Sequence, residues 1–121
     1  MANDFIRKTK ASVTTSTGTS GDAIYTVPSS GAAMECICIG IYLTNKTATG
    51  VTASVFLDTE EGSSTDVYLV KDATVPAGSA LEVISGGKLV LMGDGSNNDV
   101  VKLSCSTASS LDATISILQD V

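Results

Sequence analysis

The feature that most constrains the fold of this chain is an alternation of side chains with a period of two. Over residues 35–44 every second side chain is aliphatic. These four are Ile37, Ile39, Ile41 and Leu43, and the positions between them are Cys36, Cys38, Gly40 and Tyr42. Because successive side chains of a β-strand point to opposite faces, the pattern predicts a central strand with its aliphatic face in the core. A turn at residues 45–50 and a second alternation at residues 51–58 predict an antiparallel partner.

Five more apolar segments have the same character. They are bounded by Gly, Asn, Asp, Pro or Ser and cover residues 66–70, 79–84, 88–92, 100–105 and 112–118. The strong helix formers Glu, Lys, Arg and Gln are scarce in the chain, so helices are not expected. About seven or eight short strands at regular spacing are typical of a sandwich or small barrel. We therefore predict an all-β fold, a single antiparallel β-sandwich with jelly-roll or immunoglobulin-like connections.

Two segments of the chain resemble each other. Residues 26–37 and residues 74–84 both begin with Thr-Val-Pro and continue through Gly and Ser into an apolar run. Proline cannot donate to a strand ladder, so it is expected to end an edge segment, and the Gly and Ser beside it turn the chain. The similarity predicts that the two halves share a strand, turn and strand plan, with chance similarity as the alternative.

The first 21 residues differ in composition from the rest. A basic cluster of Arg7, Lys8 and Lys10 precedes a tract of Ser, Thr and Gly over residues 14–21. Such a tract cannot bury enough apolar surface to fold alone. We predict an extended N-terminal arm at residues 1–21 and a sandwich domain at residues 22–121, so that removing residues 1–10 leaves the sandwich folded. Phe5 and Ile6 are the expected apolar anchor, and the predicted binding residues are Phe5, Ile6, Arg7, Lys8 and Lys10.

The net charge limits the possible partners. The formal charge is −6 and the sequence pI is about 4.3, so the field of the protein repels phosphate backbones and nucleic acid is not an expected partner. No apolar stretch reaches the length of a membrane span, and the first residues lack the apolar core of a signal peptide. The sequence therefore predicts no membrane partner and synthesis in a cytosol.

The residues needed for common catalytic sites are missing. The chain contains no histidine, which removes the most frequent general base, the Ser-His-Asp arrangement and most catalytic zinc sites. The carboxylates Asp58, Glu60, Glu61, Asp94 and Asp99 cluster in expected turns, where solvation explains them. We predict a protein that is not an enzyme, with no catalytic residues and no cofactor.

Three cysteines allow several interpretations. Cys36 and Cys38 share a strand face, and Cys105 could approach from a paired strand to give three sulfur ligands or a disulfide. A fourth ligand is missing, and free cysteine is among the most buried residue types. An odd number of cysteines without a disulfide spacing also agrees with a reducing site of synthesis. The prediction is buried core thiols and no metal site.

Two other segments raise the question of a ligand. Residues 93–99 carry oxygen ligands at alternate positions, but they lack the glutamate and flanking helices of a helix-loop-helix calcium motif. A plain hairpin loop is the favoured interpretation, and a weak cation site is the alternative. Stacking on a sugar would need exposed aromatic rings, and the strand patterns assign Tyr25, Tyr42 and Tyr68 to the core or the pleat.

Several short segments resemble one group of known proteins. The segments are IYTVP at residues 24–28, IGIYLTNKT at 39–47, YLVKDATVPAGS at 68–79 and GKLVLMGD at 87–94. They resemble short β-rich virion proteins of tailed phages, including phages of cyanobacteria. The resemblance implies a virion location after synthesis in the host cytoplasm, and a capsid decoration or cement protein that stabilises the head.

The same resemblance implies partners, and the sequence leaves two alternative functions. The implied partners are the major capsid protein, other virion subunits and further copies of the chain as a homo-oligomer. A neck, tail or fibre-attachment subunit is the first alternative. The second alternative is a receptor- or glycan-binding module that uses the loops at residues 58–64 and 93–99.

Overall fold

The computed structural model describes residues 3–16, 21–28, 33–59, 66–84 and 88–120. These residues form nine strands: β1 (Asn3–Lys10), β2 (Asp22–Thr26), β3 (Met34–Asn45), β4 (Val51–Asp58), β5 (Asp66–Val75), β6 (Ala80–Glu82), β7 (Leu89–Gly93), β8 (Val100–Cys105) and β9 (Leu111–Asp120). The prediction of an all-β chain is confirmed. In the described part of the chain, no helix is long and apolar enough to cross a membrane.

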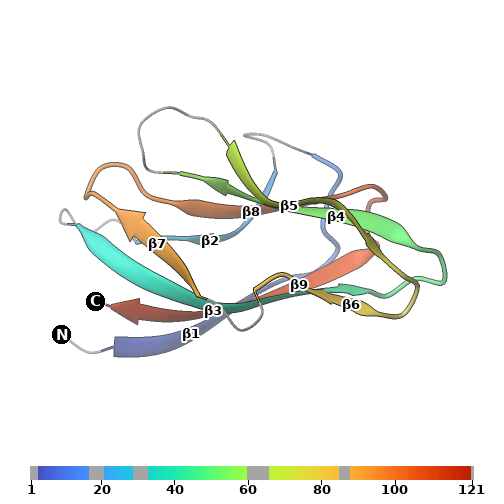
Figure 1. The fold of residues 1–121 in the computed structure, drawn as a ribbon, viewed down its shortest axis with the longest axis horizontal. Coiled ribbons are helices and arrows are strands. Elements are labelled where there is room, and N and C mark those ends of the chain that lie inside the picture. Colours follow the sequence, from blue (N-terminus) through green and yellow to red (C-terminus); the bar gives the residue numbers. More distant parts are fainter. Residues whose placement is uncertain (1–2, 17–20, 29–32, 60–65, 85–87, 121) are drawn as a thin grey trace.

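The strands form two antiparallel sheets that lie against each other (Figure 1). Sheet A has the order β1-β9-β3, and β6 and β7 both pair with the remaining edge of β3. Sheet B has the order β2-β8-β4-β5. The predicted pairing of residues 51–58 with residues 35–44 is wrong, because β4 lies in sheet B and pairs with β5 and β8. The strand pairs are nested in sequence, as in one long hairpin that is folded over into two layers. From the outside inward they are β1 with β9, β2 with β8, β3 with β6 and β7, and β4 with β5. This is the jelly-roll arrangement, so the structure decides between the two predicted topologies.

The two similar segments occupy equivalent places in this arrangement. β2 and β5 are the edge strands of sheet B, and after each of them the chain crosses to sheet A, into β3 and β6 respectively. Val27 and Val75, which precede the two prolines, are both fully buried at the crossing. Both segments therefore link an edge strand of sheet B to a strand of sheet A, and the prolines stand where an edge strand ends. The predicted turn of the first segment, at residues 29–32, lies outside the described residues.

The core lies between the sheets and consists of aliphatic and sulfur-containing side chains together with one aromatic ring, that of Tyr25. Its largest fully buried members are Ile41, Leu43, Leu91, Leu103, Leu111, Ile115 and Ile117. Each such side chain contributes about 1.5–3 kcal/mol when it leaves water. The sandwich is therefore held by close aliphatic packing between the two sheets.

The prediction of which side chains of β3 face the core is wrong for the first half of the strand. Ile41 and Leu43 are buried, but Ile37 and Ile39 lie on the outer face, and Cys36 and Cys38 take the core positions. The cause is a register shift against β9 between Cys38 and Gly40, which leaves Ile39 without a paired residue. One extra residue reverses the alternation of all side chains on one side of it.

The N-terminal segment also differs from the prediction. Residues 3–10 do not form a separate arm, because β1 pairs with β9 along its full length, from Asn3 with Asp120 to Lys10 with Ala113. Val13 is fully buried, and its backbone N–H donates to the carbonyl of Leu111 over 2.8 Å. The polar composition led to the wrong prediction of an arm, because an edge strand needs only a few apolar side chains, and Ile6 supplies one. Loss of residues 1–10 would thus expose β9.

Candidate functional site

The five predicted binding residues lie along β1, at the outer edge of sheet A, and they do not share one surface. Ile6 packs against the core of its own domain, whereas Phe5 points to the opposite face and is 79% exposed. Neighbouring residues of a strand alternate between faces, so Phe5 and Ile6 cannot insert together into one neighbour. Arg7 and Lys8 are exposed, and Lys10 lies 3.9 Å from the carboxylate of Asp22.

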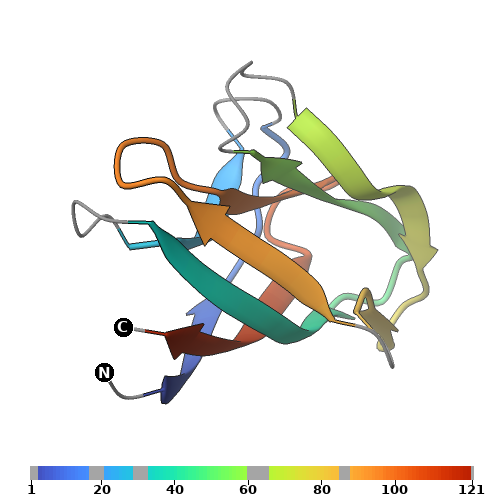
Figure 2. The ribbon, with the colours of Figure 1, turned by 60° about the vertical axis from the view of Figure 1, so that its left-hand side comes forward.

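Phe5 is the end of an apolar row that crosses the outer face of sheet A. The register places Phe5 beside Leu118, Leu118 beside Ile37, and Ile37 beside Val90. Figure 2 shows the four strands that carry them, β1, β9, β3 and β7, in succession. Leu118 and Ile37 are half-buried, and Val90 is 55% exposed. We call these four residues the apolar row.

More apolar side chains lie beside the row. Met92 follows Val90 on the outer face of β7 at 43% exposure, and Ile39, the unpaired residue of the β3 bulge, is 40% exposed. A shallow hollow of about 210 Å³ lies next to Phe5, and its lining includes Arg7, Ile39 and Ser116. Phe5, Arg7 and Ile39 thus border one hollow, and parts of Ile6 and Ile117 also line it.

The other end of the same outer face is polar and satisfied by the chain itself. Asp112 accepts hydrogen bonds from the Lys46 ammonium (2.7 Å) and from the backbone N–H of Ser12 (3.0 Å). These bonds, the one to Lys46 first, lower the pKa of Asp112 below its ordinary range. Tyr42 stands opposite Glu82, and a hydrogen bond to Glu82 raises the pKa of Tyr42. Among the described residues, the apolar end of this face therefore has no comparable set of polar contacts over it.

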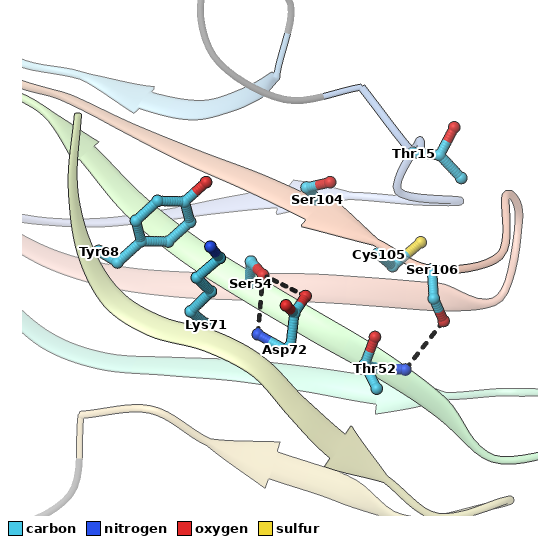
Figure 3. A pocket seen from close by; sticks show the side chains of 9 residues that line it. All are labelled: Thr15, Thr52, Ser54, Tyr68, Lys71, Asp72, Ser104, Cys105 and Ser106. Atoms are coloured by element: carbon cyan, nitrogen blue, oxygen red, sulfur yellow. Dashed lines mark hydrogen bonds between the residues drawn. The ribbon is translucent and has the colours of Figure 1, made fainter. Parts of the chain in front are cut away.

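The outer face of sheet B holds a different feature, an open basin of about 370 Å³ (Figure 3). Its lining is mostly hydroxyl-bearing or charged: Thr15, Thr52, Ser54, Tyr68, Lys71, Asp72, Ser104, Cys105 and Ser106. The Ser106 hydroxyl accepts a hydrogen bond from the backbone N–H of Thr52, and the Ser54 hydroxyl accepts one from that of Asp72, both over 3.0 Å. Asp72 has a φ of 51°, because β5 bulges there.

The basin offers hydrogen-bonding groups but no assembled nucleophile. The Ser54 hydroxyl is engaged with Asp72, and the chain has no histidine to activate it. The Lys71 ammonium stands 5.3 Å from the centre of the Tyr68 ring, and the ring packs on Phe56 at a centroid distance of 5.4 Å. A sugar stacking on Tyr68 would have to displace Lys71. The prediction that the chain is not an enzyme stays a prediction.

The cysteines are buried, as predicted, and none of the three is in a disulfide. Cys36 and Cys38 belong to sheet A, whereas Cys105 ends β8 in sheet B, so Cys105 does not approach from a strand paired with β3. Burial raises the pKa of the Cys38 and Cys105 thiols. Within the described residues, no three Cys, Asp or Glu side chains are grouped to hold a metal.

The loop after β7 is built as a turn. Gly93 and Asn98 form an isolated antiparallel bridge, so the loop folds back on itself as predicted, but β7 and β8 lie in different sheets and do not form a hairpin. The Asp94 carboxylate accepts the backbone N–H groups of Ser96 (2.8 Å) and Asn97 (2.6 Å), and these bonds lower its pKa. Asp99 likewise accepts the N–H of Met92. The carboxylates of Asp94 and Asp99 therefore accept hydrogen bonds from backbone N–H groups in and beside the loop. The other predicted contact loop, residues 58–64, falls mostly outside the described residues.

No family model matches the chain, and no curated protein matches it in sequence. Among solved structures, it is similar to a chain in the structure of infectious bursal disease virus, Gx strain, with a TM-score of 0.36 and 11% identity. The similarity covers 98% of this chain and 40% of the other, so this chain spans less than half of that length. A likeness at this level supports no argument about function. The resemblance to tailed-phage virion proteins stays a prediction.

Sequence reasoning missed the apolar row. Its members come from four strands, and their alignment depends on pairing registers that the sequence does not contain. The only signal was indirect. Val90 and Met92 flank the core residue Leu91, so two apolar side chains were left for the outer face of β7.

Proposed function

We propose that this chain is a structural protein of a phage virion, and that it decorates the capsid and stabilises the head. The observation that supports the proposal is the apolar row, which runs across one outer face of a small sandwich and stays exposed at both ends. Contiguous exposed apolar surface of this kind marks a site of protein association. The jelly roll itself is used by viral capsid and lectin domains, although fold alone does not assign a function.

In the proposed mode, the apolar row lies against the capsid surface and Arg7 contacts an acidic group beside it. A domain that binds only the assembled shell shifts the equilibrium toward assembly by its binding free energy. Small contributions per subunit become large for the particle because the contact repeats over the lattice. The major capsid protein is thus the expected partner of this face.

The test uses particles that lack the protein, incubated with the purified chain, with bound copies counted after sedimentation. Val90→Ser should weaken binding by about tenfold, because a buried valine contributes about 1.5 kcal/mol or more. Val67→Ser is the matched control, since Val67 is 49% exposed on β5 in the other sheet, close to the 55% of Val90. Equal binding by both variants would contradict the proposed face.

Copy number separates decoration from the other virion positions. On the order of hundreds of copies in native particles support a decoration protein, whereas about a dozen indicate a neck or tail subunit. Quantitative mass spectrometry of purified particles gives this number without any variant.

The basin on sheet B supports a second candidate, a binding module for a polar ligand such as a glycan. Its volume of about 370 Å³ is within the range of small-molecule sites, and Ser104, Ser106 and Lys71 supply donors and acceptors. Titration with a glycan panel, followed by nuclear magnetic resonance of the chain, tests it. Chemical shift changes at Lys71 and Ser104, lost in Lys71→Ala, would favour the module over decoration.

A further inference from the structure

β1 is one of the two long edge strands of the domain, and the ten-residue β5 of sheet B is the other. β1 is eight residues long and pairs with β9 on one side, and in the described part of the chain no strand pairs with its other side. Long unpaired edges are templates for another strand, and natural proteins usually protect them with charge or cover them. Asp4, Arg7 and Lys8 are exposed along this edge. No ion pair within the described residues engages these three side chains.

The charges on β1 are arranged so that the strand is complementary to itself in one register. Directly opposite residues of an antiparallel pair point to the same face, so a symmetric pair of β1 strands must be centred on one residue. With Ile6 at the centre, Asp4 faces Lys8 of the second copy, and Phe5 faces Arg7. Each unlike pair then occurs twice.

The other centred registers lack this complementarity. A pair centred on Asp4 opposes two carboxylates, and one centred on Arg7 opposes two guanidinium groups. A pair centred on Phe5 places Asp4 opposite Ile6 and takes Lys8 beyond the described strand of the other copy. Like charges directly opposite destabilise a strand pair, whereas unlike charges and cation–aromatic pairs stabilise it.

We propose that β1 binds β1 of a second copy, antiparallel and centred on Ile6, so that sheet A continues through a two-fold axis into the sheet of its partner. The half-buried Ile6 then meets Ile6 of the other copy on the core side of the joint. On the outer side, both apolar rows face the same direction, since the two-fold axis is perpendicular to the sheet. Only the role of the dimer, which is to present two apolar rows to one shell, rests on the proposed function. The pairing of the two β1 strands does not depend on it.

The first test measures the dimer dissociation constant of the full chain by sedimentation equilibrium in the absence of particles. Asp4→Lys and Lys8→Glu should each weaken the homodimer by about tenfold, because two attractive pairs become repulsive. A mixture of the two variants should recover dimers, because the lysine introduced at position 4 of one chain then faces the glutamate introduced at position 8 of the other. The native Lys8 and Asp4 form the second pair. Lys88→Glu, a charge reversal just before β7 at the other edge of sheet A, should leave the constant unchanged.

The outcomes separate cleanly. A chain that stays monomeric at every concentration overturns the proposal, as does a dimer that neither single reversal weakens. Single reversals that weaken the dimer without recovery in the mixture overturn the register. The three substituted chains should melt at similar temperatures, because all the altered side chains are exposed.

A second test fixes the register by oxidation. The double variant Phe5→Cys and Arg7→Cys places thiols on directly opposite positions of the two copies, at a spacing that a disulfide can bridge. The native cysteines are buried and should not compete. Rapid formation of a covalent dimer is expected, and the variant Phe5→Cys with Thr9→Cys should form it more slowly. Equal rates would contradict pairing centred on Ile6.

Failure here is distinguishable from failure of the proposed function. Dimerisation is measured without particles, and the decoration test rests on Val90, at the far end of the apolar row from β1. A monomer that still binds particles through Val90 overturns the dimer alone.

Discussion

The chain has two phenylalanines, and each lies on the outer face of a different sheet. Phe5, on sheet A, is 79% exposed, whereas Phe56, on sheet B, is fully buried. The register places Phe56 between Tyr68 of β5 and Lys102 of β8, and the Tyr68 ring packs on it. Phe5 stands at the sheet edge, with Leu118 on one side and no strand of the described residues on the other.

The difference shows that the same residue type serves two purposes in this domain. On the outer face of sheet B, the neighbouring side chains Tyr68 and Lys102 cover Phe56, and the Lys102 ammonium forms an ion pair with Asp58 at 3.1 Å. The outer face of sheet A leaves its apolar row exposed. The exposed ring of Phe5 is the one that the proposed function assigns to the contact with a partner.

The strongest test of this comparison replaces each phenylalanine by alanine. Phe56→Ala should lower the free energy of unfolding by about 3–5 kcal/mol, because it removes a fully buried ring and leaves a cavity. Phe5→Ala should change it by less than about 0.5 kcal/mol, because the ring is already in water. Urea denaturation at a concentration where the chain is monomeric measures both. Similar losses for the two variants would break the comparison.

The cover over Phe56 can be tested through Lys102. Lys102→Ala removes most of a buried aliphatic stem beside the ring and should cost about 1–2 kcal/mol. Lys102→Met keeps a stem of similar length and loses only the ion pair with the partly exposed Asp58, so its cost should stay below about 1 kcal/mol. If Lys102→Met lowers the free energy of unfolding as much as Lys102→Ala does, then the charge of Lys102, and not its aliphatic stem, stabilises the contact over Phe56.

The position of β1 is tested by Ile6. Ile6→Ala should lower the stability of the monomer by about 1–2 kcal/mol, since the side chain is partly buried against the core. A free arm would give no change. Hydrogen exchange provides a second measurement: in the wild-type chain, backbone amides of β9 should be protected on the side that faces β1. Unprotected amides there would restore the arm as first predicted.

Much of the fold could be predicted from the sequence because period-two alternation and turn residues are local signals. The strand segments and the Val-Pro ends of two edge strands follow from such signals. The burial of the cysteines was expected from residue type alone, because the alternation assigned Cys36 and Cys38 to the face opposite the core. The bulge at Ile39 could not be predicted, since it depends on how β3 fits β9. Its consequence was large, because it moved Ile37 to the outer face.

The candidate site was less predictable than the fold. Phe5 was singled out from composition, but its neighbours Leu118 and Val90 are far away in the sequence and meet only through strand pairing. The same limit applies to β1 itself. A polar strand at an edge is stabilised by backbone pairing and one inward side chain, Ile6, and neither produces a strong hydrophobic pattern.

The smallest expected effect concerns the polar end of the outer face of sheet A, where the chain does provide its own contacts. Asp112→Asn should lower the free energy of unfolding by about 0.5–1 kcal/mol at neutral pH, because the half-exposed ion pair with Lys46 is lost. The Asn side chain can still accept the N–H of Ser12. The pKa of Asp112 is lowered in the folded chain, so its contribution is complete above the unfolded value and decreases as the pH falls through about 4.

The pH dependence separates this contact from a packing effect. The difference in stability between the wild-type chain and Asp112→Asn should therefore shrink as the pH falls below the unfolded pKa, and vanish once the pH has passed through the lower folded pKa, where the carboxyl is protonated in both states. Lys46→Met should lose a similar increment at neutral pH, and the double variant should lose no more than about 0.5 kcal/mol beyond either single one. A difference that persists in acid would mean that Asp112 acts through packing. The ion pair would then not stabilise the polar end of this face. The difference between the polar end and the exposed apolar row would have to be explained in another way.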